Sequence, residues 1–193
     1  MIKGMSVNTT GLDGLRLIEP DVYRDDRGFF LETYSRRRYL DLGINGDFVQ
    51  DNHSHSKRGV LRGVHYQDMS APMGKLVFCA AGAVLDVAVD LRVGSPTFGK
   101  WYAVELSAAN ARQIFVPVGF GHAFLVLSDT ADVEYKCTGY YEKLAERVIA
   151  WNDPQIGIDW PEKRPILSAR DADGMSLREY LRRSAFRYER EAQ

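Results

Sequence analysis

The 193-residue chain is long enough for one domain with a substantial core, and 45% hydrophobic and 26% charged residues are typical of a globular protein. A formal net charge of −1 provides no basic field for nucleic acid or an anionic membrane surface. The N-terminus lacks the apolar core of a signal peptide, and the most apolar stretch, 76–85, is too short to span a bilayer. The two cysteines, Cys79 and Cys137, lie in strand-like segments and are expected to be reduced, packed thiols. We expect a single cytoplasmic domain over 1–193 with no nucleic-acid or membrane partner.

Short strands separated by polar turns dominate the middle of the chain. A short helix precedes them over 35–43, between an N-cap serine and a terminating glycine. The segment VLDVAVDL, 84–91, alternates cleanly between two faces, and the dipeptide at 81–82 before it predicts a hairpin turn. Many short strands with little helix between them predict an all-β fold, a double-sheet jelly roll with a few short helices.

The segment GVLRGVHYQ, 59–67, places an arginine and a histidine in an apolar strand. Strict alternation would put Arg62 on the face opposite His65. Strand twist or a bulge at Gly63 would be needed to bring both side chains to one ligand.

The last segment, 175–193, predicts a C-terminal helix. Ser176 and Glu179 have the spacing of a capping box. One apolar stripe follows and is expected to pack on the sheets or on a second subunit: Leu177, Tyr180, Leu181, Ala185 and Tyr188.

Two histidine motifs resemble those of cupins, which are jelly rolls. PVGFGH, 117–122, fits P-x-G-x-x-H, and HSH, 53–55, resembles H-x-H. Metal cupins add a glutamate a few residues later, where this chain has Lys57 and Arg58. Two cations disfavour a metal ion there, so we expect no metal and no other cofactor.

Several cations accompany the strand histidine. Arg27, Arg62 and Lys75 lie in or beside strand-like segments, as do His65 and the polar run at 50–52. Arginine binds phosphate bidentately, and a pocket with cations, a histidine and aromatic walls suits a phosphorylated small molecule.

Eight segments, in order and with matching spacing over residues 14–171, resemble the dTDP-4-dehydrorhamnose 3,5-epimerases. They are DDRGFFLE, FVQDNHS, GVLRGVHYQ, GKLVFCAAGAVLDVAVDLRVGSPTFGKW, FVPVGFGHAFLVLSD, YKCTGYY, DPQIGIDWP and ILSARD. The resemblance implies a metal-free jelly-roll homodimer. It also implies conversion of dTDP-4-keto-6-deoxyglucose to dTDP-4-keto-rhamnose by epimerisation at carbons 3 and 5.

The resemblance also assigns roles to individual residues. His65 matches the base, Asp171 the residue that orients it, Tyr135 the proton donor and Lys75 the residue near the keto oxygen. The implied substrate-contacting positions are Arg27, Glu32, Gln50, Asn52, Arg62, Lys75, His122, Tyr140, Glu146 and Arg170, with Tyr140 stacking on thymine.

Three alternatives stay open. The nearest is a mono-epimerase acting on carbon 3 or carbon 5 only, in deoxysugar biosynthesis for a natural product. The others are a metal-dependent cupin oxygenase and a non-catalytic nucleotide-sugar binding module. Proton exchange at the two carbons and metal analysis would separate them.

Overall fold

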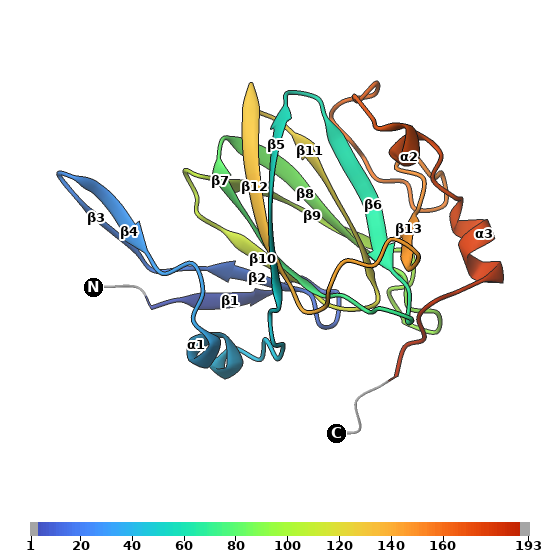
Figure 1. Ribbon diagram of the computed structural model, residues 1–193, viewed down its shortest axis with the longest axis horizontal. Helices are drawn as coiled ribbons and strands as arrows, with labels where there is room; N and C mark the ends of the chain where they lie inside the picture. The colour runs from blue at the N-terminus through green and yellow to red at the C-terminus, as the bar shows by residue number, and fades with distance from the viewer. Residues whose placement is uncertain (1–3, 190–193) are drawn as a thin grey trace.

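The computed structural model describes residues 4–189, whose strands form two antiparallel sheets packed face to face (Figure 1). The six-stranded sheet has the order β1 (Ser6–Thr9), β2 (Arg16–Glu19), β10 (Gln113–Val116), β7 (Lys75–Ala81), β12 (Thr130–Cys137) and β5 (Gln50–Lys57). The five-stranded sheet has the order β13 (Glu146–Val148), β6 (Leu61–Gln67), β11 (Phe120–Val126), β8 (Ala83–Asp90) and β9 (Trp101–Ser107). The predicted all-β jelly roll is confirmed.

A separate hairpin and three short helices complete the described part of the chain. The hairpin consists of β3 (Val22–Asp25) and β4 (Gly28–Leu31), and the helices are α1 (Arg36–Asp41), α2 (Ala169–Ala172) and α3 (Leu177–Arg182). The helix predicted over 35–43 is confirmed as α1. No helix within residues 4–189 is long and apolar enough to cross a membrane.

Strand β8 shows how the alternating pattern builds two cores. Val84 and Ala88 face the other sheet and belong to the core between the sheets. Val87 and Val89 face the opposite way, into a second core that includes Trp160 from the C-terminal part of the chain. The alternation predicted over 84–91 is confirmed. The two cysteines are buried and free, as predicted.

The turn at Ala81–Gly82 does not close a hairpin, so that prediction is wrong. Strand β7 pairs with β10 and β12 in one sheet, whereas β8 pairs with β11 and β9 in the other. The chain therefore crosses between the sheets at this point. A strand-turn-strand pattern does not itself show which neighbour each strand will pair with, because pairing depends on distant segments.

A β-bulge in β6 overturns the predicted faces of its polar residues. His65 lies opposite His122 and Arg62 lies opposite Phe124, so three residue steps of β6 match two steps of β11. The extra residue moves Arg62 to the side of His65, and both line one cavity. Gly63 has φ +123°, and a Cβ there would lie 2.5 Å from the His122 carbonyl oxygen, so the bulge requires glycine.

The C-terminal helix is shorter than predicted. Its capping box between Ser176 and Glu179 is present, but α3 ends at Arg182. Residues 183–189, named here the C-terminal strap, instead run beside Val93 in the segment that follows β8. Val93 donates a backbone hydrogen bond to Phe186 and accepts one from Tyr188, each at 3.0 Å. This pairing outweighs local helix propensity. Residues 190–193 of the predicted helix lie outside the described residues.

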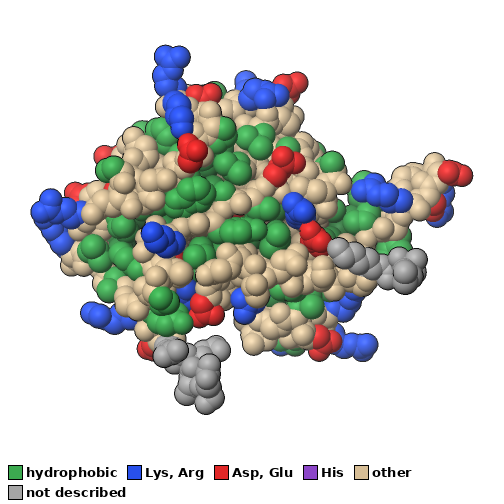
Figure 2. Space-filling model, turned by 180° about the vertical axis from the view of Figure 1, so that it is seen from behind, with side chains coloured by type: hydrophobic (Ala, Val, Ile, Leu, Met, Phe, Trp, Pro, Cys, Tyr) green, Lys and Arg blue, Asp and Glu red, His purple; other side chains and the backbone are tan. Residues whose placement is uncertain are grey.

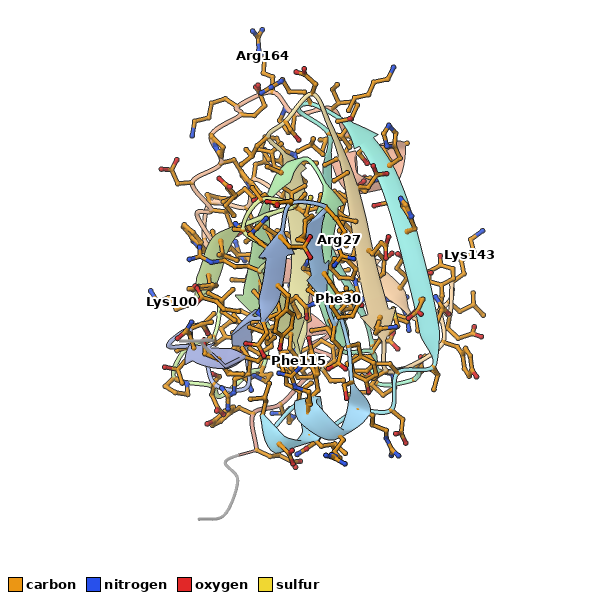
Figure 3. All side chains as sticks on the ribbon, turned by 90° about the vertical axis from the view of Figure 1, so that its left-hand side faces the viewer. Arg27, Phe30, Lys100, Phe115, Lys143 and Arg164 are labelled. Carbon is orange, nitrogen blue, oxygen red and sulfur yellow. The ribbon has the colours of Figure 1, made fainter. Side chains whose placement is uncertain are left out.

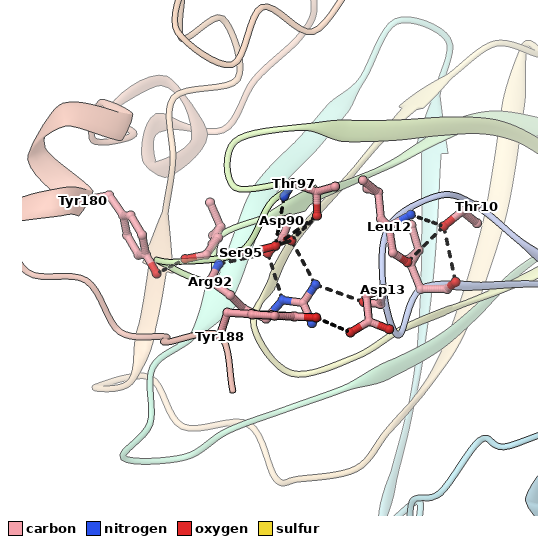
Figure 4. Close-up of polar contacts among 11 residues, drawn as sticks. Thr10, Leu12, Asp13, Asp90, Arg92, Ser95, Thr97, Tyr180 and Tyr188 are labelled. Carbon is pink, nitrogen blue, oxygen red and sulfur yellow. Dashed lines mark hydrogen bonds and ion pairs between the residues drawn. The ribbon is translucent and has the colours of Figure 1, made fainter. Parts of the chain in front are cut away.

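The C-terminal strap is fixed through Arg92 (Figure 4). The Arg92 guanidinium lies 5.1 Å from the Tyr188 ring centroid and 4.6 Å from that of Phe120. It also donates two hydrogen bonds of 2.9 Å to buried Asp90. Because Phe120 lines the cavity between the sheets, the strap supports one wall of that cavity.

The β3–β4 hairpin projects from the sheets on the side away from α3 (Figure 1). It bears Arg27 and Phe30 (Figure 3), and its aromatic residues Phe29 and Phe30 are 56% and 69% exposed. Figure 2, which views the molecule from behind the view of Figure 1, shows hydrophobic side chains over the centre of that face, with Lys and Arg interspersed with Asp and Glu toward the margin. This mixture agrees with the near-neutral net charge.

Candidate active site

A polar cavity of about 310 Å³ opens between the two sheets. Strands β6 and β11 line it from the five-stranded sheet, and β5, β7 and β12 line it from the six-stranded sheet. Residues predicted for the site that line this cavity are Gln50, Asn52, Arg62, His65, Lys75, His122, Tyr135, Glu146 and Arg170.

His65 and Asp171 form a close pair at the cavity wall. The Nε2 atom of His65 lies 2.5 Å from Oδ1 of Asp171, which is 3% exposed. The Ser168 hydroxyl donates to the other oxygen of Asp171 at 2.6 Å, and the Gly63 N–H donates to Oδ1 at 3.3 Å. Ser168 is the N-cap of α2, so the helix start positions Asp171. This network orients the imidazole and leaves its Nδ1 without a partner among residues 4–189.

The environment gives the pair a defined charge state. Burial raises the pKa of Asp171, but hydrogen bonds from His65 and Ser168 outweigh it and hold the pKa at about 2. Burial lowers the pKa of His65 below 6.5, and the bond to Asp171 offsets this only in part. At neutral pH, Asp171 is therefore ionised and His65 is a neutral imidazole able to accept a proton.

Lys75 and Tyr135 face this pair from the six-stranded sheet. The Lys75 Nζ lies 5.5 Å from the Tyr135 ring centroid. Burial raises the pKa of Tyr135, so its phenol keeps its proton at neutral pH. Burial lowers the pKa of Lys75, and nearby acidic groups, including Glu146, oppose that shift. The site thus places a neutral imidazole, which can act as a base, and a neutral phenol, which can act as an acid, on facing walls of the cavity.

Tyr141 is a cavity residue that the sequence reasoning missed. Its hydroxyl donates to Oε2 of Glu146 at 2.9 Å, and the Arg170 guanidinium contacts the same oxygen. Its backbone N–H donates to Gln50 at 3.0 Å. The neighbouring Tyr140, which was predicted to contact the substrate, is 68% exposed and does not line the cavity. The consecutive tyrosines of TGYY were the available signal, but consecutive side chains point in different directions.

Arg27 and Glu32 lie outside the cavity of their own chain. Arg27 is on the projecting hairpin, where its side chain is 91% exposed and pairs with Asp25 at 2.6 Å. Glu32 pairs with Arg38 at 3.2 Å. Neither residue lines the cavity. Within a single chain, the prediction that they contact the substrate is therefore not supported.

The histidines of HSH point away from the cavity. His53 and His55 are 57% and 60% exposed and each lies 2.9 Å from Asp132. Their neighbours Asn52 and Ser54 line the cavity instead, as strand alternation requires. The described residues contain no group of three or more His, Cys, Asp or Glu placed to hold a metal ion.

A carboxylate-held imidazole and a neutral phenol, on facing walls of one polar cavity in a jelly roll, define a class of enzyme that removes a proton and returns one, an epimerase. The chain belongs to the dTDP-4-dehydrorhamnose 3,5-epimerase family, whose model matches residues 9–179. It is therefore an isomerase.

Individual relatives agree with the family match. The dTDP-4-dehydrorhamnose 3,5-epimerase of Salmonella typhimurium is 51% identical over 170 residues, covering 87% of this chain and 93% of its own. The solved dTDP-6-deoxy-D-glucose-3,5-epimerase of Legionella pneumophila, in complex with dTDP-4-keto-L-rhamnose, is 49% identical with a TM-score of 0.92. That match covers 96% of this chain and 100% of the other. A Streptomyces niveus dTDP-4-dehydrorhamnose 3-epimerase is 40% identical, covering 91% of this chain and 85% of its own.

Proposed function

We propose that this protein inverts carbons 3 and 5 of dTDP-4-keto-6-deoxyglucose to give dTDP-4-keto-rhamnose. The main support is the placement of neutral His65 and neutral Tyr135 on facing walls of one cavity. The names of the Salmonella and Legionella relatives support the substrate and both positions of epimerisation.

His65 removes the proton from a carbon next to the ketone. The C–H bond breaks, its electrons form the enolate, and the proton goes to Nδ1, because Nε2 is held by Asp171. The Asp171 carboxylate stabilises the imidazolium that forms. The Lys75 ammonium stabilises the negative charge that develops on the former keto oxygen.

Tyr135 returns a proton to the opposite face of the same carbon. Its O–H bond breaks and a new C–H bond forms with inverted configuration. The phenolate and the imidazolium then exchange protons with solvent, which restores the starting state. Carbons 3 and 5 both adjoin the ketone at carbon 4, so one base and one acid serve both positions.

The remaining cations suit the diphosphate. Arg62 and Arg170 both line the cavity, and guanidinium groups bind phosphate oxygens bidentately. The Arg62 Nε donates to the Ser56 hydroxyl at 3.1 Å, which orients its side chain. Tyr140 is exposed and therefore available to stack on the thymine ring.

A mono-epimerase is the second candidate, because the 40% identical Streptomyces niveus relative is named a 3-epimerase. None of the relatives described above is named an oxygenase or a binding module. The deciding experiment is proton NMR of dTDP-4-keto-6-deoxyglucose with the enzyme in deuterium oxide. We expect exchange and inversion at both carbons. Signal loss at only one carbon would establish the mono-epimerase, and no exchange at either would refute catalysis.

A cytoplasmic homodimer is part of this proposal. The projecting hairpin exposes Phe29 and Phe30, which association with a second copy would cover. Arg27 and Glu32 match substrate-contacting positions of the family but lie outside their own cavity, so we place them at the cavity of a partner subunit. The free, buried thiols of Cys79 and Cys137 support a reducing compartment.

A further inference from the structure

The cavity contains a second histidine–carboxylate pair. His122 on β11 lines the cavity, and its Nε2 lies 2.8 Å from Oδ2 of Asp86 on β8. The two residues are 6% and 0% exposed. His122 also lies directly opposite His65 in the β6–β11 ladder. The five-stranded sheet therefore presents two carboxylate-held imidazoles side by side.

Asp86 is a carboxylate buried among apolar neighbours, with His122 as its hydrogen-bond partner and the buried Lys75 ammonium as a nearby opposite charge. It follows the alternation of β8 and lies between Val84 and Ala88, which belong to the core between the sheets. Its Oδ1 is buried and accepts no hydrogen bond within residues 4–189. Leaving a buried carboxylate oxygen unpaired costs stability, and an asparagine of the same shape would be less costly to bury. A buried carboxylate with an unpaired oxygen, bound to a histidine that lines the cavity, points to a role at that histidine.

The carboxylate fixes which ring nitrogen of His122 bears the proton. Asp86 accepts from Nε2–H, and it is the ring's only hydrogen-bond partner among the described residues. In the neutral imidazole, Nδ1 then bears no proton and is able to accept a hydrogen bond. Directly opposite residues of an antiparallel pair have Cβ atoms about 4.5–5.5 Å apart, so His122 and His65 can contact the same sugar ring.

We propose that Asp86 is a positioning residue that acts through His122. It holds the Nε2–H tautomer, so that Nδ1 accepts a hydrogen bond from a hydroxyl of the keto sugar. That bond sets how the sugar ring lies over His65, and thereby the relative rates of proton removal at the two carbons beside the ketone. The inference rests on the function proposed above and adds what determines the choice between carbons 3 and 5.

The test is the variant Asp86→Asn, whose amide can donate to Nε2 and drive the proton of His122 to Nδ1. We expect the ratio of deuterium exchange at carbon 3 to that at carbon 5 to change at least about threefold, and kcat to fall about 10- to 100-fold, as for a misplaced substrate. The melting temperature should stay the same or rise. Nitrogen-15 shifts of the four histidines should report the tautomer change.

The control is Asp153→Asn. Asp153 is also buried, at 4% exposed, but it lies outside the cavity and accepts from the backbone N–H groups of Gln155, Ile156 and Leu177. We expect this variant to lose thermal stability and to keep the exchange ratio of the parent.

An unchanged exchange ratio in Asp86→Asn, with or without slower turnover, overturns the proposal. If that variant does not fold, His122→Gln must change the ratio, and an unchanged ratio there is equally decisive. In a variant with both changes, Asp86→Asn should have no further effect if it acts only through His122. Failure of the proposed function is distinguishable, because the parent enzyme would then show no exchange or exchange at only one carbon.

Discussion

Burial sets the charge state of the two side chains proposed to move protons. It lowers the pKa of His65 and raises that of Tyr135, so both are neutral at pH 7. A neutral imidazole accepts a proton and a neutral phenol donates one. Because the two residues belong to different sheets, the two proton transfers fall on different sides of a ligand between the sheets.

Tyr135→Phe separates the two transfers. The phenyl ring preserves packing, including the contact with Lys75, and only the hydroxyl is lost. His65 should still remove the proton and return solvent deuterium to the original face. We expect deuterium in the substrate with retained configuration, while inverted product falls about 100-fold or more. Proton NMR in deuterium oxide measures both. Equal losses of exchange and inversion, or normal inversion, would rule out Tyr135 as the second-face donor.

The variant Asp171→Asn tests the role of the Asp171 carboxylate through the pH dependence of kcat/KM. Protonation of His65 abolishes the base, so kcat/KM falls as the pH drops through its pKa, which lies below 6.5. Without the carboxylate the imidazolium of His65 is less stable, so the pKa of His65 falls further. The acid limb of the kcat/KM profile therefore moves to lower pH. The plateau should drop about 10²- to 10⁴-fold. Profiles from about pH 5 to pH 8 measure this. Exposed Asp173→Asn is the control, and an acid limb moved upward in the Asp171 variant would contradict the assignment.

At the scale of the elements, the bulge in β6 brings Arg62 and His65 to one cavity. Gly63→Ala should disrupt it, because a Cβ would lie 2.5 Å from the His122 carbonyl oxygen at φ +123°. We expect a loss of about 2–4 kcal/mol in unfolding free energy and about 100-fold in turnover. Urea denaturation and kinetics provide the measurements.

Gly59→Ala is the matched control for that variant. Gly59 also has a positive φ, +77°, but nothing lies within 4 Å of an added Cβ. Its cost should be about 1 kcal/mol, with near-normal turnover. Equal effects of the two substitutions would mean that backbone strain, and not the close contact at the bulge, makes glycine necessary at position 63.

Elements with a strong local pattern could be predicted from the sequence, and those decided by distant pairing could not. The alternation over 84–91 and the jelly roll follow from period and turn spacing. The sheet change at Gly82 and the bulge at Gly63 depend on which strands pair, which no local window contains. The C-terminal strap is not helical, although its sequence has a helical pattern, because Phe186 and Tyr188 form backbone hydrogen bonds with Val93 instead.

For the site, the resemblance identified most of the residues that line the cavity, but it did not show which subunit supplies each predicted residue. Residues on β5, β6, β7, β11 and β12 converge because these strands adjoin within the two sheets. Arg27 and Glu32 matched the family equally well but lie outside the cavity. A sequence motif implies that a residue contacts substrate but does not say which subunit supplies that residue. Asp86 lies within a matched segment, but the resemblance gave it no role, and its unpaired oxygen beside His122 identified it.

At the scale of the whole molecule, the hairpin is the element that a single chain does not explain. If Arg27 serves the partner's cavity, each complete site needs two chains. Mixing the variants Arg27→Ala and His65→Asn tests this. In a hybrid dimer, the subunit with intact His65 would receive an intact Arg27 from its partner, so one site would be complete. Random exchange makes half of the dimers hybrid, so about a quarter of all sites should be active.

The expected result is activity in the mixture well above that of either variant alone, after subunits have exchanged. Light scattering must first show a mass of twice 21.8 kDa, because a monomer would exclude shared sites. Arg164→Ala with His65→Asn is the control pair, since Arg164 is exposed and outside the cavity: mixing should add nothing to the activity of the Arg164 variant. A mixture no more active than its parts would place Arg27 in its own subunit's site or outside catalysis.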